Sequence, residues 1–173
     1  MPTNCLKVRT VWFAPILLLL LTPSQATSQS NQFFARLEGS WQGEGKAFGM
    51  GARLQIKWEW VLEKKFLRLT LRNEMSTPNG QKQTFEGQAY YQSSAGDKSD
   101  AHWFDSRGVT FPIKAHVEGD ALVALWGSPD KEEGKSTYRL IDDGTLEVVD
   151  TVKQKDGTWR EFGRATLKRF QVG

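Results

Sequence analysis

The chain has a single cysteine, Cys5, which lies before a run of apolar residues near its N-terminal end. The rest of the chain can therefore form no disulfide, supply no thiol nucleophile and offer no thiolate to a metal ion. Without disulfides, a folded domain depends on its hydrophobic core. Cys5 also precedes the apolar run, which is the wrong place for a lipid-modified cysteine at a cleavage point.

The first 26 residues are typical of a secretory signal peptide. Lys7 and Arg9 form a positive region, the stretch 11–21 is apolar, and Ser24-Gln25-Ala26 is a small-residue cleavage site. The apolar stretch is shorter than the roughly 20 residues that span a membrane. We expect residues 1–26 to be removed and the protein to be exported to the periplasm or the medium. The alternative is a retained N-terminal anchor.

Neither sign of charge dominates the remaining chain. The sequence has 23 lysines and arginines and 20 acidic residues, so the loss of Lys7 and Arg9 leaves 21 basic residues against the same 20. No basic stripe remains, and the charge gives no support to nucleic-acid binding. We expect no nucleic-acid partner and no membrane span after signal cleavage.

Helical patterns of ordinary length are missing, and short segments with a period of two replace them. The clearest places Leu54, Ile56, Trp58 and Trp60 on one face of a strand. Polar residues rich in Gly, Asp, Asn and Pro separate the segments, as expected of turns, with longer polar loops over 93–100 and 128–135. The predicted strands cover about 37–45, 54–60, 67–72, 84–91, 101–105, 111–118, 121–127, 137–141, 145–153 and 158–170.

These ten segments predict an all-β fold, because no room is left for the crossover helices of a parallel sheet. A single up-and-down antiparallel β-barrel is the simplest arrangement, since closure removes exposed strand edges. An open sandwich is the structural alternative. Residues 27–31 are predicted to be a flexible leader, and 32–38 a short helical turn that covers one end. The predicted domain therefore spans 32–173.

The run Leu37–Gly45 is the most specific motif. Trp41 suits a plug at one end of the barrel, and Gly39, Gly43 and Gly45 let the first strand bend. The Gly39-x-Trp41 pair resembles the first-strand signature of lipocalins and other calycins. The full spacing Leu37-x-Gly39-x-Trp41-x-Gly43-x-Gly45 is similar to the nitrobindin-like branch, whose members are ten-stranded barrels, and to a bacterial lipocalin-like family of unknown function.

The resemblance implies an apolar cavity for a small hydrophobic molecule, which is haem in nitrobindins. Nitrobindins bind the iron through a histidine on a late strand, but the histidines here, His102 and His116, lie on middle strands. Tyr or Met could ligate iron only in principle. We therefore expect no haem and no other cofactor. In lipocalins a basic residue of the final strand packs over the first-strand tryptophan, which implies Arg164 or Arg169 over Trp41.

Aromatic residues are the main candidates for a ligand site. We predict that Trp58, Trp60, Tyr91 and Phe104 line the cavity; the alternative is that they fill a solid interior. Arg164 is predicted to face solvent if Gly163, Ala165 and Leu167 face inward. In the opposite orientation, Arg164 would enter the cavity and pair with an anion such as a fatty-acid carboxylate.

Catalytic and metal motifs are weak. His102 and Asp105 could form an acid–base pair only if the turn after them brings them together, because residues three apart in a strand lie on opposite faces. A metal site would need His102 beside His116 and a third ligand, which is not evident. Known nucleophile, phosphate and zinc motifs are absent. The remaining acids, Asp142, Asp143, Asp150 and Asp156, are assigned mainly to turns.

The sequence therefore predicts an exported binding protein that holds a small hydrophobic ligand, such as an acyl chain, with no catalytic and no metal-ligating residues. One alternative is a hydrolase or isomerase on the same barrel that uses His102 and Asp105. The other is a structural or interaction protein with a ligand-free interior.

Overall fold

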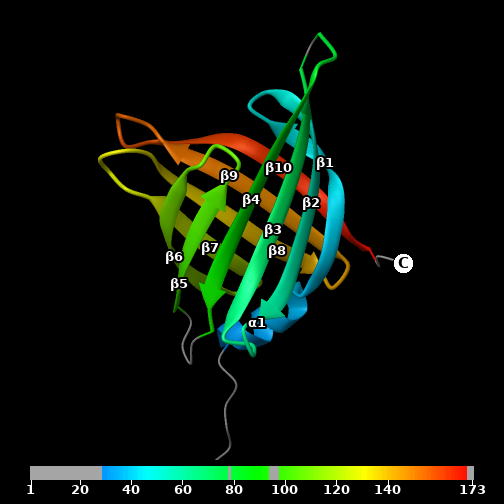
Figure 1. Ribbon diagram of the computed structural model, residues 1–173, viewed down its shortest axis with the longest axis vertical. Coiled ribbons are helices and arrows are strands. Elements are labelled where there is room, and N and C mark those ends of the chain that lie inside the picture. Colours follow the sequence, from blue (N-terminus) through cyan, green and yellow to red (C-terminus); the bar gives the residue numbers. More distant parts are fainter. Residues whose placement is uncertain (1–28, 78, 94–97, 171–173) are drawn as a thin grey trace, which may run out of the picture.

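A closed barrel of ten antiparallel strands with a short helix at one end forms the computed structural model of the chain (Figure 1). It describes residues 29–77, 79–93 and 98–170, so the predicted signal peptide lies outside the described residues. Within those ranges, no helix is long and apolar enough to cross a membrane. The elements are α1 (Gln29–Leu37), β1 (Gly39–Ala47), β2 (Met50–Val61), β3 (Phe66–Ser76), β4 (Lys82–Gln92), β5 (Lys98–Asp105), β6 (Thr110–Glu118), β7 (Ala121–Gly127), β8 (Glu133–Asp142), β9 (Thr145–Lys153) and β10 (Trp159–Phe170).

The strands follow one another around the barrel in sequence order, and β1 closes the ring against β10. Each strand therefore has a hydrogen-bonded neighbour on both sides, and no edge is left open to pair with another chain. The predicted up-and-down barrel is confirmed, and the open sandwich is excluded.

Several strands begin earlier than the sequence predicts, and two of them show why. β8 starts at Glu133 instead of 137, and β5 at Lys98 instead of 101. The inward positions of these early segments hold Gly134 and Ser99, which pair with Trp126 and Ala115 across the sheet. Small residues at inward positions interrupt the apolar alternation, so the sequence predicted loops over these two segments.

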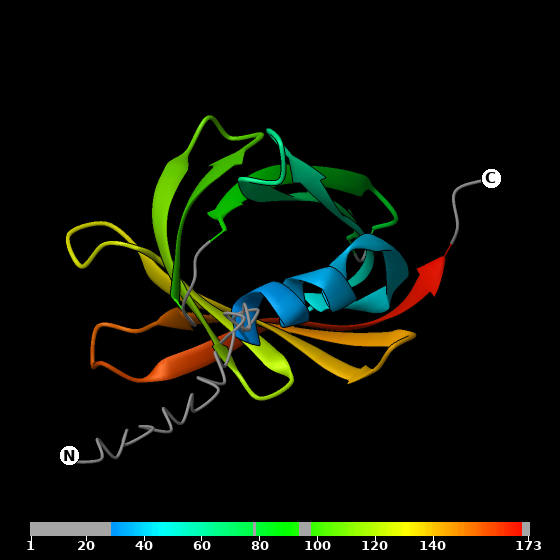
Figure 2. The same ribbon diagram turned by 90° about the horizontal axis from the view of Figure 1, so that it is seen from below.

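The helix α1 crosses the lower end of the barrel, as Figure 2 shows from below. It begins at Gln29, so residues 29–31, predicted as part of the leader, belong to its first turn. Phe33, Phe34 and Leu37 recur at helical spacing and are buried. The helix therefore seals this end with its apolar face.

The lower half of the barrel interior is completely packed. Trp41 and four inward-facing leucines from four strands have no solvent exposure: Leu67, Leu122, Leu146 and Leu167. Burying a leucine side chain contributes roughly 1.5–3 kcal/mol, so this half holds much of the stability of the fold.

The glycines of β1 let this strand approach β10 closely. A Cβ atom added at Gly43 or Gly45 would overlap the backbone of residues 164–167. Gly39 has φ of 125°, and a Cβ there would lie 2.6 Å from Nη1 of Arg169. The alternating glycines of the motif thus make room for the last strand and for its arginine.

Arg169 holds Trp41 in place at the sealed end. Its guanidinium carbon lies 4.1 Å from the centroid of the Trp41 ring, a cation–π contact. The indole Nε1 of Trp41 donates a hydrogen bond to the carbonyl oxygen of Leu37 at 2.8 Å. Of the two arginines that the resemblance implied, Arg169 makes the contact.

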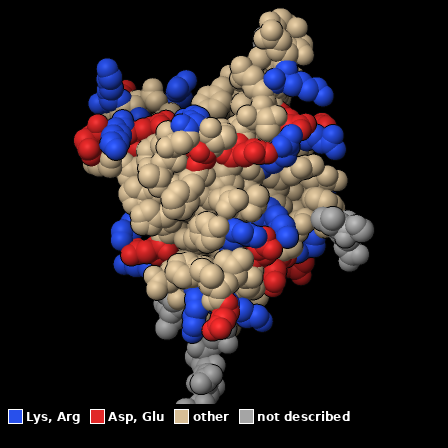
Figure 3. All heavy atoms as spheres, viewed as in Figure 1, with Lys and Arg blue, Asp and Glu red and all other residues tan. Residues whose placement is uncertain are grey.

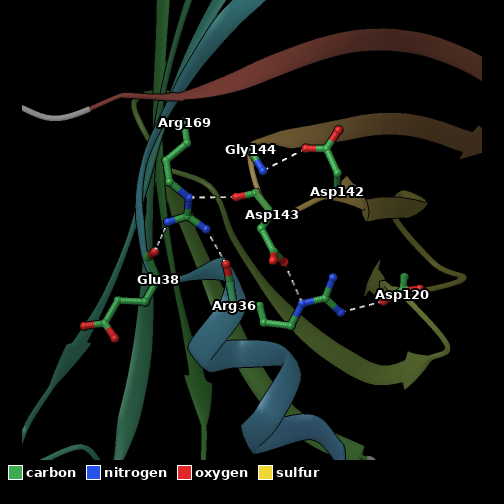
Figure 4. A network of polar contacts seen from close by, with 7 residues as sticks. All are labelled: Arg36, Glu38, Asp120, Asp142, Asp143, Gly144 and Arg169. Carbon is green, nitrogen blue, oxygen red and sulfur yellow. Dashed lines mark hydrogen bonds and ion pairs between the residues drawn. The ribbon is translucent and has the colours of Figure 1, made fainter.

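The same guanidinium joins three segments of backbone (Figure 4). Arg169 donates to the carbonyl oxygens of Arg36 and Glu38, both at 2.5 Å, and to that of Asp143 at 3.0 Å. The first two carbonyls stand at the C-terminal end of α1, where they have no intrahelical partner and where a cation is favourable. Arg169 therefore ties the helix, the start of β1 and the β8–β9 turn together.

A second arginine strengthens this link from the helix side. Arg36 forms ion pairs with Asp120 at 2.5 Å and Asp143 at 3.3 Å, which anchor α1 to the β6–β7 and β8–β9 turns. All three side chains are largely exposed, so each pair contributes little, about 0–1 kcal/mol.

Acidic and basic side chains lie intermingled on the face of the molecule seen in Figure 3. Arg72, for example, pairs with Glu74 at 3.1 Å and Glu86 at 2.5 Å. No continuous basic patch covers this face, in keeping with the balanced charge of the sequence.

We predict that Arg169→Lys lowers the free energy of unfolding by roughly 1–3 kcal/mol, because one ammonium cannot reach three carbonyl groups and cover the indole at once. Urea unfolding followed by tryptophan fluorescence measures the change. Arg164→Lys, on the outer face of the same strand, is the matched control and should cost less than about 1 kcal/mol. Equal losses in both variants would contradict a special role for Arg169.

Candidate ligand-binding site

Solvent reaches the inner wall of the barrel at the end opposite α1. There the inward-facing aromatic side chains Phe85, Trp103 and Trp126 pack against the core but are only half-buried. Ser136 and Asp150, on the inward faces of β8 and β9, are also half-buried. Because α1 is the only helix within the described ranges and lies at the other end, no helix covers this one. The upper half of the barrel is the candidate site.

Two aromatic pairs form the walls of the upper half. The ring centroids of Phe85 and Trp103, on β4 and β5, are 6.3 Å apart with an interplanar angle of 23°. Those of Phe111 and Trp126, on β6 and β7, are 5.5 Å apart with an angle of 31°. These four rings offer an apolar surface of the kind that lines small-molecule sites.

Glycines on neighbouring strands position the two indoles. A Cβ atom at Gly87 would overlap the ring of Trp103, and one at Gly134 would overlap the ring of Trp126. Each indole therefore occupies the space that a side chain would fill and lies against the adjacent strand. The two tryptophans line the wall as a result.

An aromatic layer forms the floor of the site. Trp58 of β2 contacts Tyr91 of β4 and Tyr138 of β8, with ring centroids 5.4 Å and 5.2 Å apart. Phe34 of α1 packs beneath Tyr91 at 6.3 Å. Burial raises the pKa of both tyrosine hydroxyls well above the usual value, so both stay neutral.

A short chain of hydrogen bonds leads from the aromatic wall to a carboxyl group. Trp126 Nε1 donates to Ser136 Oγ at 3.2 Å, and Ser136 Oγ donates to Asp150 Oδ1 at 2.6 Å. Burial raises the pKa of Asp150 to about 6; the hydrogen bond from Ser136 acts against this shift, and the charge of Glu161 adds to it. Asp150 therefore changes charge just below neutral pH.

Two further polar atoms inside the barrel lack partners. Trp58 Nε1 and Asn73 Oδ1 are buried and make no hydrogen bond with the described residues. A buried polar atom without a partner costs about 1–3 kcal/mol. Such groups are rare in native proteins and call for an explanation, which a polar group of a ligand would supply.

A second acid, Asp105, has a structural role at the rim. Its side chain is fully buried; it accepts a hydrogen bond from Trp103 Nε1 at 3.0 Å and pairs with Arg107 at 2.7 Å. Burial acts to raise the pKa of Asp105, but the bonds from Arg107 and Trp103 outweigh it and lower the pKa. Arg107 also lies 5.4 Å from the ring centroid of Phe85. Asp105 is thus an ionised carboxylate whose charge is balanced by Arg107, and its hydrogen bond orients Trp103 in the aromatic wall.

Three of the predicted lining residues face the interior. Trp58 and Tyr91 belong to the floor, and Trp60 lies below it, 6.2 Å from Phe34 of the helix. The prediction for Phe104 is wrong: its side chain is 49% exposed on the outer face, 6.4 Å from Tyr90. Since Trp103 points inward, the next residue of the strand must point outward.

Arg164 also lies outside the barrel, in the orientation that the sequence favoured. It pairs with Glu147 and Glu161, both at 2.7 Å. These hydrogen bonds and charges raise the pKa of its guanidinium further. Arg164 therefore cannot serve as the internal partner for a fatty-acid carboxylate.

The histidines are not brought into any site. His102 is exposed on the outer face and pairs across the sheet with Tyr90 and Pro112, whereas the side chain of Asp105 points inward. The partner of His116 across the β5–β6 pair is Lys98, so the histidines are not neighbours. In the part of the chain that the structure describes, no three His, Cys, Asp or Glu residues are grouped so that they could hold a metal ion.

Asp150 is the residue that sequence reasoning missed. The predicted strand over 145–153 contains it, but it was grouped with acids found mainly in turns; it lies within β9 on the face of Leu146 and Val148. The period of two along this segment could have revealed that Asp150 faces inward. In the same way, the face shared by Ala101 and Trp103 could have revealed that Trp103 belongs to the wall of the site.

No protein-family model matches the chain, and no curated protein matches it by sequence. Solved structures do. The crystal structure of Rv2717c from M. tuberculosis is 17% identical with a TM-score of 0.64, over 83% of this chain and 98% of that one. The S-type phycobiliprotein lyase CPES from Guillardia theta is 11% identical with a TM-score of 0.60, over 83% and 93%. At these identities the likeness shows the fold, a lipocalin-like barrel of ten strands.

Proposed function

We propose that the chain is an exported protein that binds a small, mostly apolar molecule in the upper half of its barrel. One observation carries the proposal: the inward-facing aromatic side chains Phe85, Trp103 and Trp126, at the end opposite α1, are only half-buried and stand above a floor of Trp58, Tyr91 and Tyr138. Export rests on the signal-like residues 1–26.

Two features favour binding over a solid, ligand-free interior. The glycines under Trp103 and Trp126 keep both indoles against the wall. The buried, unpaired atoms of Trp58 and Asn73 lower the stability of the free protein, which suggests that a bound molecule offsets this cost.

An enzymatic role has less support. One structural neighbour is named a phycobiliprotein lyase, so enzymes occur on this fold. In this chain, however, His102 and Asp105 lie on opposite faces of β5, and neither can orient the other for acid–base chemistry. Binding is therefore the function that we propose.

We predict that the neutral apolar dye N-phenyl-1-naphthylamine binds the barrel with a rise in its fluorescence. Trp103→Ala or Trp126→Ala should weaken binding by about tenfold, because each removes a large part of the aromatic wall, worth roughly 1.4 kcal/mol. Trp159→Ala is the matched control, since Trp159 is 42% exposed and stacks only with Lys135 on the outside. Titration of the dye measures all four affinities.

An absence of dye binding to the unaltered protein would contradict the proposal. An equal loss of affinity in the Trp159→Ala control would mean that the dye binds outside the barrel.

Asp150 generates a separate prediction for stability. Its pKa in the folded state, about 6, exceeds the ordinary value of 3.8, so the folded protein loses stability as pH rises from about 4 through 6. Asp150→Asn should therefore stabilise the protein at pH 8, by up to about 3 kcal/mol, and have little effect at pH 4. Thermal unfolding at both pH values measures the difference. A destabilised variant at pH 8 would show that the carboxylate is compensated by the fold.

A further inference from the structure

We propose that the ligand carries a positively charged nitrogen group, which binds to Asp150. This inference rests on the proposed function and names the polar end of the molecule. The ligand class is an apolar body, such as an alkyl chain or an aromatic ring, with a protonated amine or a protonated heterocyclic nitrogen.

Asp150 has one oxygen available for a ligand. Oδ1 accepts the hydrogen bond from Ser136, whereas Oδ2 accepts none from the described residues. The strand beside Oδ2 has Gly163, where an added Cβ would lie 3.3 Å from that oxygen. Gly163 therefore places no side chain over Oδ2.

The surroundings of Asp150 provide no cation. Among the residues described, no lysine, arginine or histidine forms an ion pair with it, and the charge that acts on its pKa is that of Glu161 of β10, which already pairs with Arg164. The other titratable groups that face it are the neutral hydroxyls of Tyr91 and Tyr138. A half-buried carboxylate without a counter-ion is partly desolvated, so it attracts an incoming cation more strongly than a fully exposed carboxylate does.

The aromatic walls favour the same charge. The faces of Trp, Tyr and Phe rings attract cations, most strongly where water is excluded. Asn73 Oδ1, the unpaired acceptor on β3, can accept a further N–H. An anionic group would instead meet Asp150 and the negative faces of the rings. At the rim, Arg107 is already paired with Asp105, and Arg160, opposite Val152, is exposed to water.

Competition among three probes of equal chain length tests the inference. Decylamine, decanol and decanoate are titrated at pH 8 against bound N-phenyl-1-naphthylamine; at this pH the amine is charged and Asp150 is ionised. We expect decylamine to compete at least about tenfold better than decanol, and decanoate to compete worst.

Asp150→Asn should bring decylamine to within about twofold of decanol, because the amide cannot form the ion pair; the dye is titrated on each variant separately, so that the competitors are compared on the same protein. Asp100→Asn is the matched control: Asp100 pairs with Lys114 on the outer surface, is 68% exposed, and its loss removes the same charge. The control should keep the full preference for the amine.

The unaltered protein gives a second test that needs no substitution. Its preference for decylamine over decanol should shrink as pH falls from 8 to 5, because Asp150 becomes protonated near pH 6. The Asp150→Asn variant should show no such change.

The outcomes separate the two proposals. Dye binding with no preference for the amine, or a preference that survives Asp150→Asn, would overturn this inference and leave the proposed function standing. Failure of both the dye and decylamine to bind would overturn the proposed function and this inference with it.

Discussion

The contact of Arg169 with Trp41 and three backbone carbonyls is the constraint on which the rest of the structure depends. A barrel that holds an apolar molecule must be closed at one end, or water would enter from both sides. Here the closure joins residues 131 and 133 positions apart, since the last strand supplies the cation that caps the helix before the first strand. The closure of the ring and the closure of the end therefore depend on the same strand: β10 pairs with β1, and its Arg169 holds the helix. Folding of this end depends on contacts of long sequence separation, which slow folding because a long loop must be closed to form them.

The two halves of the interior carry different tasks. The lower half is packed with leucine and aromatic side chains that have no exposure, and it gives the fold its stability. The upper half and its floor contain groups that lower stability: within the described ranges, the carboxylate of Asp150 forms no ion pair, and an indole N–H and an amide oxygen form no hydrogen bond. Unfavourable groups of this kind gather at functional sites, where binding compensates them. The floor of Trp58, Tyr91 and Tyr138 separates the two regions.

The alternation of residue types predicted most of the architecture and part of the site. It placed ten strands, turned Trp58 and Trp60 inward, and favoured Arg164 on the outside, because a period of two records which face of a strand is buried. Phe104 was chosen as an aromatic residue close to others in sequence, against the parity set by Ala101 and Trp103. Asp150 was grouped by residue type with acids that lie mainly in turns, although the predicted strand over 145–153 contains it. What no local pattern contains is the pairing between strands: only the register of β7, β8 and β9 brings Trp126, Ser136 and Asp150 into line.

The two glycines beneath the indoles have a consequence for how such a barrel can change. At Gly87 and Gly134 a single methyl group would force the ring off the adjacent strand and toward the barrel axis. The width of the upper half of the barrel therefore depends on Gly87 of β4 and Gly134 of β8, which leave space for the two indole rings against the wall. Alanine at either position, in evolution or by design, would narrow the open end for a thinner ligand and would leave Asp150, the floor and the sealed end unchanged.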